Sequence, residues 1–426
     1  MAPTATPREP LGPRFRHLLA FAGLSNLADG ILLVGAPLYA VSLTRAPGQI
    51  SLLSAAATVP WLLFALYAGL MVDRHDRPRI IAAATAVRVV VLVAAAAAAA
   101  TGRLTLPLLV LTLLIHGCAE VFADTSARTL VPDVAPHGRL AAANSRLMGV
   151  EQLANSFLGG PLAGFVLALG AGWVLGLPAA LAVAALVVVL RGLWGKVPPP
   201  ARPDAAPTSR RTELREGLAF LWGHRVVRSL ILGGTAFNFA SSAYFAVFVL
   251  WVVGPGSAVG LAEEAYGLLM IGFAVGAIGG AVLAERIVGT GRERRIIAVT
   301  WGTGAVIVVV PALVPNPWAI AAALTAAGFA NMVGNVATSS LRQRLVPSRL
   351  LGRVSGAGTT IAYGAMPLGA LAGGLVAEIF GLRALLLAVP GFLAVAVALT
   401  VAAFTQHDVA VADADADRDR LATITG

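Results

Sequence analysis

Long apolar segments separated by short polar ones run through almost the whole sequence. Each has roughly the length of about 20 residues that a helix needs to cross the hydrocarbon core of a bilayer. Twelve segments are expected to form such helices, at about 17–42, 50–72, 80–101, 105–127, 142–167, 172–194, 227–252, 264–285, 296–314, 317–340, 354–379 and 384–404. The pattern therefore predicts an all-α polytopic membrane protein with twelve transmembrane helices.

Composition supports this interpretation and excludes others. Of 426 residues, 58% are hydrophobic and only 12% are charged, and the mean hydropathy is +0.83. The basic residues behind the net charge of +10 are dispersed between apolar segments, which argues against nucleic-acid binding. Cys118 is the sole cysteine, so a disulfide framework or a cysteine-based metal site is not expected. We predict no metal, no cofactor and no removable signal peptide.

The positions of the basic residues predict the orientation. If the N-terminus is cytoplasmic, only Arg45, Arg103 and Arg383 lie in outside loops, Arg88 lies within a span, and all other basic residues are cytoplasmic. A bias of this kind sets the topology of membrane proteins. Both termini are therefore expected in the cytoplasm.

A polar segment divides the chain into two halves. It begins rich in proline and continues into a predicted amphipathic helix that ends near Trp222. The predicted parts are a cytoplasmic N-terminus at 1–16, a six-helix bundle at 17–194, the linker with its amphipathic helix at 195–226, a second six-helix bundle at 227–404, and a disordered cytoplasmic tail at 405–426.

The loop after the second span carries a characteristic set of residues, Gly69, Asp73, Arg74 and Arg77. A glycine lets two helices approach closely, and a carboxylate beside arginines is suited to a cytoplasmic gate. The pattern resembles the loop between the second and third helices of the major facilitator superfamily of membrane transporters. Asp76 and Pro78 depart from that superfamily's usual residues.

The two halves resemble each other. Asp73-Arg74 after the second span corresponds to Glu285-Arg286 after the eighth, and Leu130 to Pro132 corresponds to Leu345 to Pro347. Since each half has six spans, both halves share one orientation, as in the parallel repeats of this superfamily. The substrate path is therefore expected between the halves.

Further short motifs narrow the resemblance. They are Asn26 to Gly30, Pro60 to Phe64, Glu120-x3-Asp124, Asn144-Ser145 and Gly352 to Ser355. Together they resemble the enterobactin-exporter-like, or transmembrane secretion effector, branch of bacterial efflux proteins. The resemblance implies the major facilitator fold and a multi-pass location in the bacterial inner (plasma) membrane.

Five ionisable side chains stand out inside the predicted spans: Asp29, Arg88, Glu120, Asp124 and Glu151. Each costs at least about 2.5–3.5 kcal/mol near the centre of the bilayer and needs a role. A rise of about 1.5 Å per residue puts Arg88, Glu120 and Glu151 at one level, which predicts a buried ion cluster. One arginine cannot neutralise two carboxylates, so Glu120 and Glu151 are candidates for proton coupling as well as for structure. Asp124 is expected to reach the arginines of the gate.

Asp29 is the third candidate for proton coupling, because it lies nearer the middle of its span. The alternative is that Asp29 bonds to backbone groups at a kink around Gly30. The resemblance implies that the first, fourth, seventh and tenth helices line the substrate cavity. The candidates on them are Asn26, Asn238, Ser241, Ser242, Phe245, Asn331 and Asn335.

One glycine-rich motif favours export. Gly159, Gly160, Pro161 and Gly164 resemble the antiporter motif of drug exporters, and we expect this motif to pack against the eighth helix.

The favoured function is a proton-coupled exporter of small apolar or amphipathic molecules, such as drugs, secondary metabolites or siderophores. The alternatives are a facilitator or importer of a polar nutrient and, more remotely, a membrane-embedded enzyme. The six histidines are scattered without metal-ligand spacing, which argues against the enzyme. The expected partners are the lipid bilayer, a small-molecule substrate and protons, and we expect a monomer.

Overall fold

The computed structural model describes residues 11–72, 74–170, 172–197, 210–289, 291–412 and 414. Three predicted features lie outside these residues: Asp73 of the gate, the proline-rich linker at 198–209, and the acidic tail from 415 onward. The described chain is almost entirely helical, and its only β-type pairing is an isolated bridge between Val253 and Leu261. The predicted all-α fold class is confirmed.

The first half follows the predicted spans. Its long helices are α1 (Gly12–Val41), α2 (Pro47–Val72), α3 (Arg77–Ala100), α4 (Leu106–Val134) and α7 (Trp173–Gly192). Between α4 and α7 lie the 3-10 turn η1 (His137–Arg139), α5 (Leu140–Gln152), the π-helix η2 (Leu153–Gly159) and α6 (Gly160–Ala168). The fifth predicted span is thus divided among α5, η2 and α6 instead of forming one regular helix.

The second half begins with α8 (Arg210–Gly223), which covers the predicted amphipathic helix. It continues with α9 (Arg225–Val252), α10 (Glu263–Ile287), α11 (Glu293–Ile307), the short α12 (Val310–Leu313), α13 (Pro317–Leu345), α14 (Ser348–Phe380) and α15 (Leu382–Ala402). Among the described residues, eleven helices are long and apolar enough to cross a membrane if α11 and α12 are taken together. The divided fifth span accounts for the twelfth.

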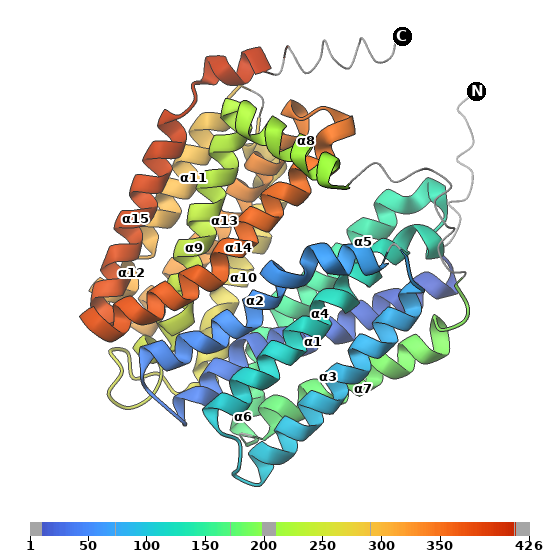
Figure 1. The fold of residues 1–426 in the computed structure, drawn as a ribbon. Coiled ribbons are helices and arrows are strands. Elements are labelled where there is room, and N and C mark those ends of the chain that lie inside the picture. The colour runs from blue at the N-terminus through green and yellow to red at the C-terminus, as the bar shows by residue number, and fades with distance from the viewer. Residues whose placement is uncertain are drawn as a thin grey trace, which may run out of the picture. The chain divides into compact units, whose positions relative to one another are not determined.

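The chain divides into two compact units, whose helices are labelled in Figure 1. The first unit contains α1 up to Ala36, the end of α2 from Leu63, and α3 to α7. The second contains Pro37–Leu62 and α8 to α15. The C-terminal end of α1 and the N-terminal part of α2 thus belong to the second unit. There the Gly48 amide donates to Oε2 of Glu378 at 3.0 Å.

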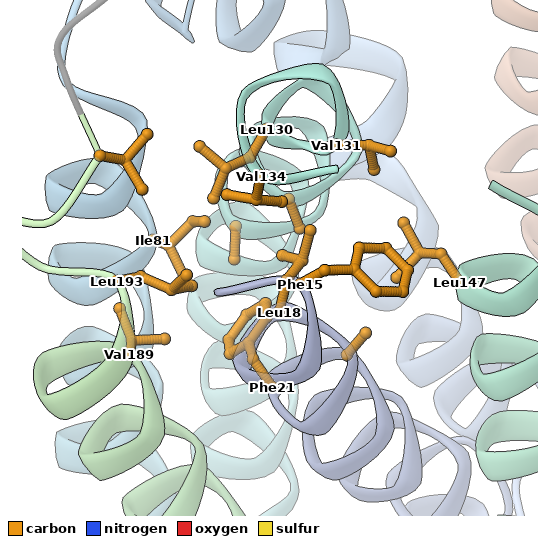
Figure 2. Packing of buried hydrophobic residues seen from close by; sticks show 14 of the residues in the cluster. Phe15, Leu18, Phe21, Ile81, Leu130, Val131, Val134, Leu147, Val189 and Leu193 are labelled. Carbon is orange, nitrogen blue, oxygen red and sulfur yellow. The ribbon is translucent and has the colours of Figure 1, made fainter. Parts of the chain in front are cut away.

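The core of the first unit is built mainly from residues of α1, α3, α4, α5 and α7. Figure 2 shows Phe15, Leu18 and Phe21 of α1 beside Leu130 and Val131 of α4. The cluster continues into the other helices with Ile81, Val134, Leu147, Val189 and Leu193. Because α1 lies at the centre of this cluster, its polar face is held in a fixed register against α3 and α4.

The core of the second unit includes parts that the sequence places outside the membrane. Leu221 of α8 is fully buried there, and so are Phe404 and Val409 beyond α15. The Nε of Arg294 donates to the carbonyls of Val401 and Phe404, at 3.1 and 2.9 Å. The tail predicted to be disordered from residue 405 therefore starts with an ordered, packed segment, because two apolar side chains anchor it.

The π-helix η2 lies where α1 crosses the fifth span. Pro161 has no N–H to donate to the carbonyl four residues earlier, and its ring crowds that carbonyl, which disfavours a regular helix there. A Cβ on Gly30 would lie 2.1 Å from the Asn155 carbonyl oxygen, and one on Gly159 would lie 2.5 Å from the Cα of Gly30. Gly159 therefore packs against α1 within the first unit.

Candidate functional site

A buried ion pair joins α1 to α3. The Nη2 of Arg88 donates to Oδ1 of Asp29, and its Nη1 donates to the hydroxyl of Ser25. Ser25 and Asp29 are four residues apart, so they lie one turn apart on the same face of α1. Arg88 is only 1% exposed. This guanidinium is thus held by one helix face, away from solvent.

Helix α4 adds a ladder of titratable groups to this pair. The Nε2 of His116 lies 2.9 Å from the same Oδ1 of Asp29, and both side chains are buried. Glu120 follows one turn later, and one ligand atom from each of Asp29, His116 and Glu120 lies within 4.8 Å of the others. Asp124, one turn further, is also buried. We call Ser25, Asp29, Arg88, His116 and Glu120 the Asp29 network.

The Asp29 network has unused polar atoms and an imbalance of charge. Among the described residues, Oδ2 of Asp29, Nε of Arg88 and Nδ1 of His116 are buried without a hydrogen-bond partner. An unpaired polar atom inside a protein costs about 1–3 kcal/mol, so such atoms mark a strained or functional site. The network also holds two carboxyl groups for one arginine. Binding a proton relieves that imbalance at a lower cost than burying an uncompensated charge.

Three of these groups are also of the kind that bind metal ions. However, Oδ1 of Asp29, the oxygen nearest His116, already accepts from Arg88. A divalent cation bound there would face the positive charge of that arginine at close range. The arrangement is that of a carboxylate–guanidinium network, in which the arginine already supplies the positive charge that a cation would bring.

The structure changes two predicted partnerships. Arg88 pairs with Asp29, whereas Glu151 pairs with Arg128 at 3.1 Å, so the predicted cluster of Arg88, Glu120 and Glu151 does not form as a unit. A count of residues gives depth only along an untilted helix, and it does not include the reach of a long arginine side chain. Helix α1 also runs without a break through Gly30, so Asp29 does not cap a kink there.

Two members of the network were missed in the sequence. His116 does not have the spacing of a metal ligand, and Ser25 is an uncharged residue of a span, so neither is predicted as a site residue. The signal that identifies them is spacing by four, which places Ser25 one turn from Asp29, and His116 one turn from Glu120. Spacing relative to an intramembrane acid is therefore more informative here than the search for metal-binding motifs.

The described residues of the predicted gate have other partners than expected. Arg77, at the start of α3, pairs with Asp133 near the end of α4, and not with Asp124, which lies deeper in α4. Arg74 is exposed, and a Cβ on Gly69 would meet no atom within 4 Å. Asp76 caps α3 by accepting from the Arg79 amide at 3.1 Å, which explains an acid at that position.

The second half repeats the gate bridge with its charges exchanged. Glu293, at the start of α11, lies 2.6 Å from Arg344 near the end of α13. Like Arg77 and Asp133, they lie at the start of the third and near the end of the fourth long helix of their half, although Arg344 is not at the position that the repeat aligns with Asp133. The internal repeat therefore preserves the link between two helix ends while reversing which end carries the acid.

The predicted cavity side chains are mostly bonded within their own unit. Asn26 donates to the Ala22 carbonyl at 3.0 Å, and Asn335 donates to Oδ1 of Asn331 at 3.0 Å. Asn238 donates to the Ala362 carbonyl, at 3.3 Å. Ser241 and Ser242 are half-buried, and the ring of Phe245 contacts those of Tyr244 and Phe248. Their part in binding substrate remains a proposal.

Fold and site together define the class of the protein. Eleven helices that are long and apolar enough to span a membrane, together with the divided fifth span, form a fold similar to that of solved membrane transporters, and this is the fold expected of the major facilitator superfamily. The chain belongs to the transmembrane secretion effector family of that superfamily, whose family model matches residues 5–423. The resemblance read from the short motifs is thereby confirmed, and the chain is a transporter and not an enzyme.

Relatives of similar sequence agree with this assignment. The chain is 27% identical over 392 residues to the multidrug efflux pump Tap of Mycobacterium tuberculosis (strain ATCC 25618 / H37Rv), covering 88% of this chain and 90% of that one. It is also 27% identical over 386 residues to the MFS-type transporter y4rN of Sinorhizobium fredii, covering 85% and 88%.

Among solved structures, a bacterial homologue of the human lysosomal transporter Spinster matches with a TM-score of 0.69 at 16% identity, covering 94% of this chain and 97% of that one. The nucleoside transporter NupG matches with a TM-score of 0.70 at 15% identity, covering 92% and 100%. At these identities the structural matches establish the fold alone.

Proposed function

We propose that this transporter is a proton-coupled exporter of small apolar or amphipathic molecules, such as drugs, secondary metabolites or siderophores. The observation that carries the proposal is the Asp29 network, in which a buried arginine and a buried carboxyl group lie beside the half-buried Glu120 on spanning helices. Ionisable groups at such depth are costly and are found where protons or ions are moved. The similarity to a multidrug efflux pump supports an apolar cargo.

The network suggests how a proton acts. In the deprotonated state the Asp29 carboxylate holds Arg88 and His116 together and ties α1 to α3 and α4. A proton on Asp29 removes the charge that holds the guanidinium, which frees Arg88 for a second acceptor. Glu120 is a candidate, because one of its carboxylate oxygens lies within 4.8 Å of an oxygen of Asp29. Proton binding and helix contacts are thereby linked, as alternating access requires.

Other parts of the proposal rest on the sequence. We infer that both termini are cytoplasmic, that the protein lies in the plasma membrane of a bacterium as a monomer, and that the bundles at 17–194 and 227–404 move as its transport halves. The polar side chains of α9 and α13, with Asn26 of α1, are proposed to contact substrate. The loop of Gly69, Arg74 and Arg77 is proposed to close the cytoplasmic side.

The test is proton movement in vesicles that contain the purified protein. A pH-sensitive dye inside the vesicles reports protons while a panel of apolar and amphipathic compounds is added in turn. At least one compound is expected to move protons with the wild-type protein and to accumulate against its gradient when a pH difference is imposed. Asp29→Asn is expected to lower both signals to those of empty vesicles, because the amide keeps the shape but carries no exchangeable charge.

Glu151→Gln is the matched control, since Glu151 is an acid of the same half whose partner, Arg128, lies outside the Asp29 network. It is expected to keep most of the proton signal. Uphill transport by Asp29→Asn would remove Asp29 from the coupling mechanism. Accumulation of a polar nutrient, without proton movement for any apolar compound, would favour the importer instead.

A further inference from the structure

A groove on the second unit lies between the first turns of α9 and the last turns of α15. Its volume is about 520 Å³. Figure 1 shows α9 and α15 as neighbouring helices of this unit, and they are in direct contact. Its lining includes two arginines and four large apolar residues: Arg225, Arg228, Leu232, Phe392, Val395 and Leu399.

The wall of this groove is apolar and open. Leu232, Phe392, Val395 and Leu399 are 43%, 47%, 59% and 67% exposed. Exposed apolar side chains on spanning helices meet the hydrocarbon of the bilayer, because water is absent there. The groove is therefore accessible to an acyl chain from the side.

One end of the groove is cationic. Arg225 and Arg228 are three residues apart in the first turn of α9 and so share one face of the helix. Nη1 of Arg228 donates to the Trp222 carbonyl at 2.7 Å, which fixes the guanidinium while its other N–H groups point elsewhere. Trp222 is half-exposed at the end of α8, as is common for tryptophan at the level of lipid headgroups.

The two arginines are not equivalent. Nη1 of Arg225 lies 3.9 Å from Oδ2 of Asp408 in the segment after α15. The amide and the hydroxyl of Thr405 donate to this carboxylate and hold the pKa of Asp408 below its usual range, so it remains an anion. Arg225 thus already faces a counter-ion, whereas Arg228 bonds only to a neutral carbonyl among the described residues. Within the described part of the chain, Arg228 therefore carries a positive charge without a matching anion.

We propose that this groove binds an anionic phospholipid of the adjoining leaflet. The phosphate would lie against Arg228 and Arg225, and one acyl chain would lie along Leu232, Val395 and Leu399. The charge favours an anionic over a zwitterionic headgroup. The exposed apolar wall favours a lipid over a small soluble anion, since such an anion gains nothing from it. The site stands apart from the Asp29 network and does not rest on the proposed export function.

The ligand has a structural consequence. A phospholipid in this groove contacts α9 and α15 together and lies beside α8, so it joins elements that otherwise meet at one edge. A ligand that binds only the folded state stabilises that state in proportion to the logarithm of its concentration. The second unit is therefore expected to be more stable in membranes that contain anionic lipid.

The test uses the full chain purified from vesicles that contain equal amounts of phosphatidylglycerol and phosphatidylcholine. Native mass spectrometry is expected to find phosphatidylglycerol retained in preference to phosphatidylcholine. Arg228→Gln is expected to abolish the preference, and Ala396→Trp, which fills the groove and leaves the charges, is expected to abolish retention. Arg295→Gln removes an exposed arginine at the start of α11 and is expected to change neither.

A second measurement separates lipid from free anion and does not depend on a groove-filling variant that folds. The melting temperature of the detergent-solubilised wild-type protein is measured with added phosphatidylglycerol, phosphatidylcholine or inorganic phosphate. Only phosphatidylglycerol is expected to raise it, and Arg228→Gln is expected to lose that rise. Equal effects of the two lipids, an equal effect of phosphate, or the same loss in Arg295→Gln would each overturn the proposal.

Discussion

Asp29 accepts hydrogen bonds from two helices on a single carboxylate oxygen, while its second oxygen is buried without a partner. A residue placed in this way couples its own charge to the packing of α1 against α3 and α4. Glu151, in contrast, meets an exposed arginine near the end of α4. The burial of the partner, and not the acid itself, distinguishes the ion pair of Asp29 from that of Glu151.

At this scale the pairing of Arg88 can be tested directly. Arg88→Leu leaves Asp29 as an uncompensated buried acid, and breaking a buried pair typically costs about 3–5 kcal/mol. The thermal stability of the purified variant is therefore expected to fall sharply. Adding Asp29→Asn is expected to restore part of it, because the buried charge is then removed from both sides.

The control for this rescue is Arg88→Leu with Glu151→Gln, which should be no more stable than Arg88→Leu alone. If Glu151→Gln rescues the arginine variant and Asp29→Asn does not, the ion pair described here is wrong.

At the scale of the elements, the crossing of α1 and η2 determines how the fifth span packs against α1. Gly30 and Gly159 bring the two backbones together where no Cβ fits, directly beside Asp29. The π-helix adds a residue to one turn there and redirects the fifth span before α6 begins. Close packing by small residues is a common way to join helices in membranes, where the hydrophobic effect between helices is absent.

Gly30→Ala is expected to destabilise the protein by about 1–3 kcal/mol, because overpacking forces backbone shifts. The new Cβ would lie 2.1 Å from the Asn155 carbonyl oxygen. Gly149→Ala, in α5, is the matched control: its Cβ would meet no atom within 4 Å, and replacing glycine in a helix gains up to about 1 kcal/mol. Thermal unfolding of both variants checks this, and equal melting temperatures would contradict the close crossing.

For the whole molecule, the repeat and the orientation are the features with the widest consequences. The bridge from Arg77 to Asp133 recurs as Glu293 to Arg344 with the charges exchanged, so each half has its own link between the corresponding helix ends. Links of this kind tie helices within a half. They are compatible with halves that move as units during transport.

The orientation can be tested by labelling single cysteines in a Cys118→Ser background. His75→Cys lies in the loop after α2, and Ala258→Cys lies in the loop after α9, both exposed. The distribution of arginines predicts that a membrane-impermeant maleimide labels Ala258→Cys on intact cells, and His75→Cys only after the membrane is opened. The reverse pattern would place both termini outside.

The number, length and order of the spans could be read from the sequence, because an apolar run must reach across a bilayer of given thickness whatever its neighbours are. The family could also be read from the sequence. Its motifs each consist of a few residues close together in the chain, so they can be recognised without the tertiary structure. The interruption at η2 could not be read, because a lone Pro161 is also compatible with a simple kink.

The partner of Arg88 was decided only by the tertiary structure. The sequence established that an arginine and several acids are buried, and that each therefore needs a counter-charge. Which acid meets the arginine depends on the tilt of α1, its close crossing at Gly30 and the reach of a long side chain. The position of a residue along one span indicates its depth in the membrane, whereas its contacts with other helices depend on how the helix faces pack.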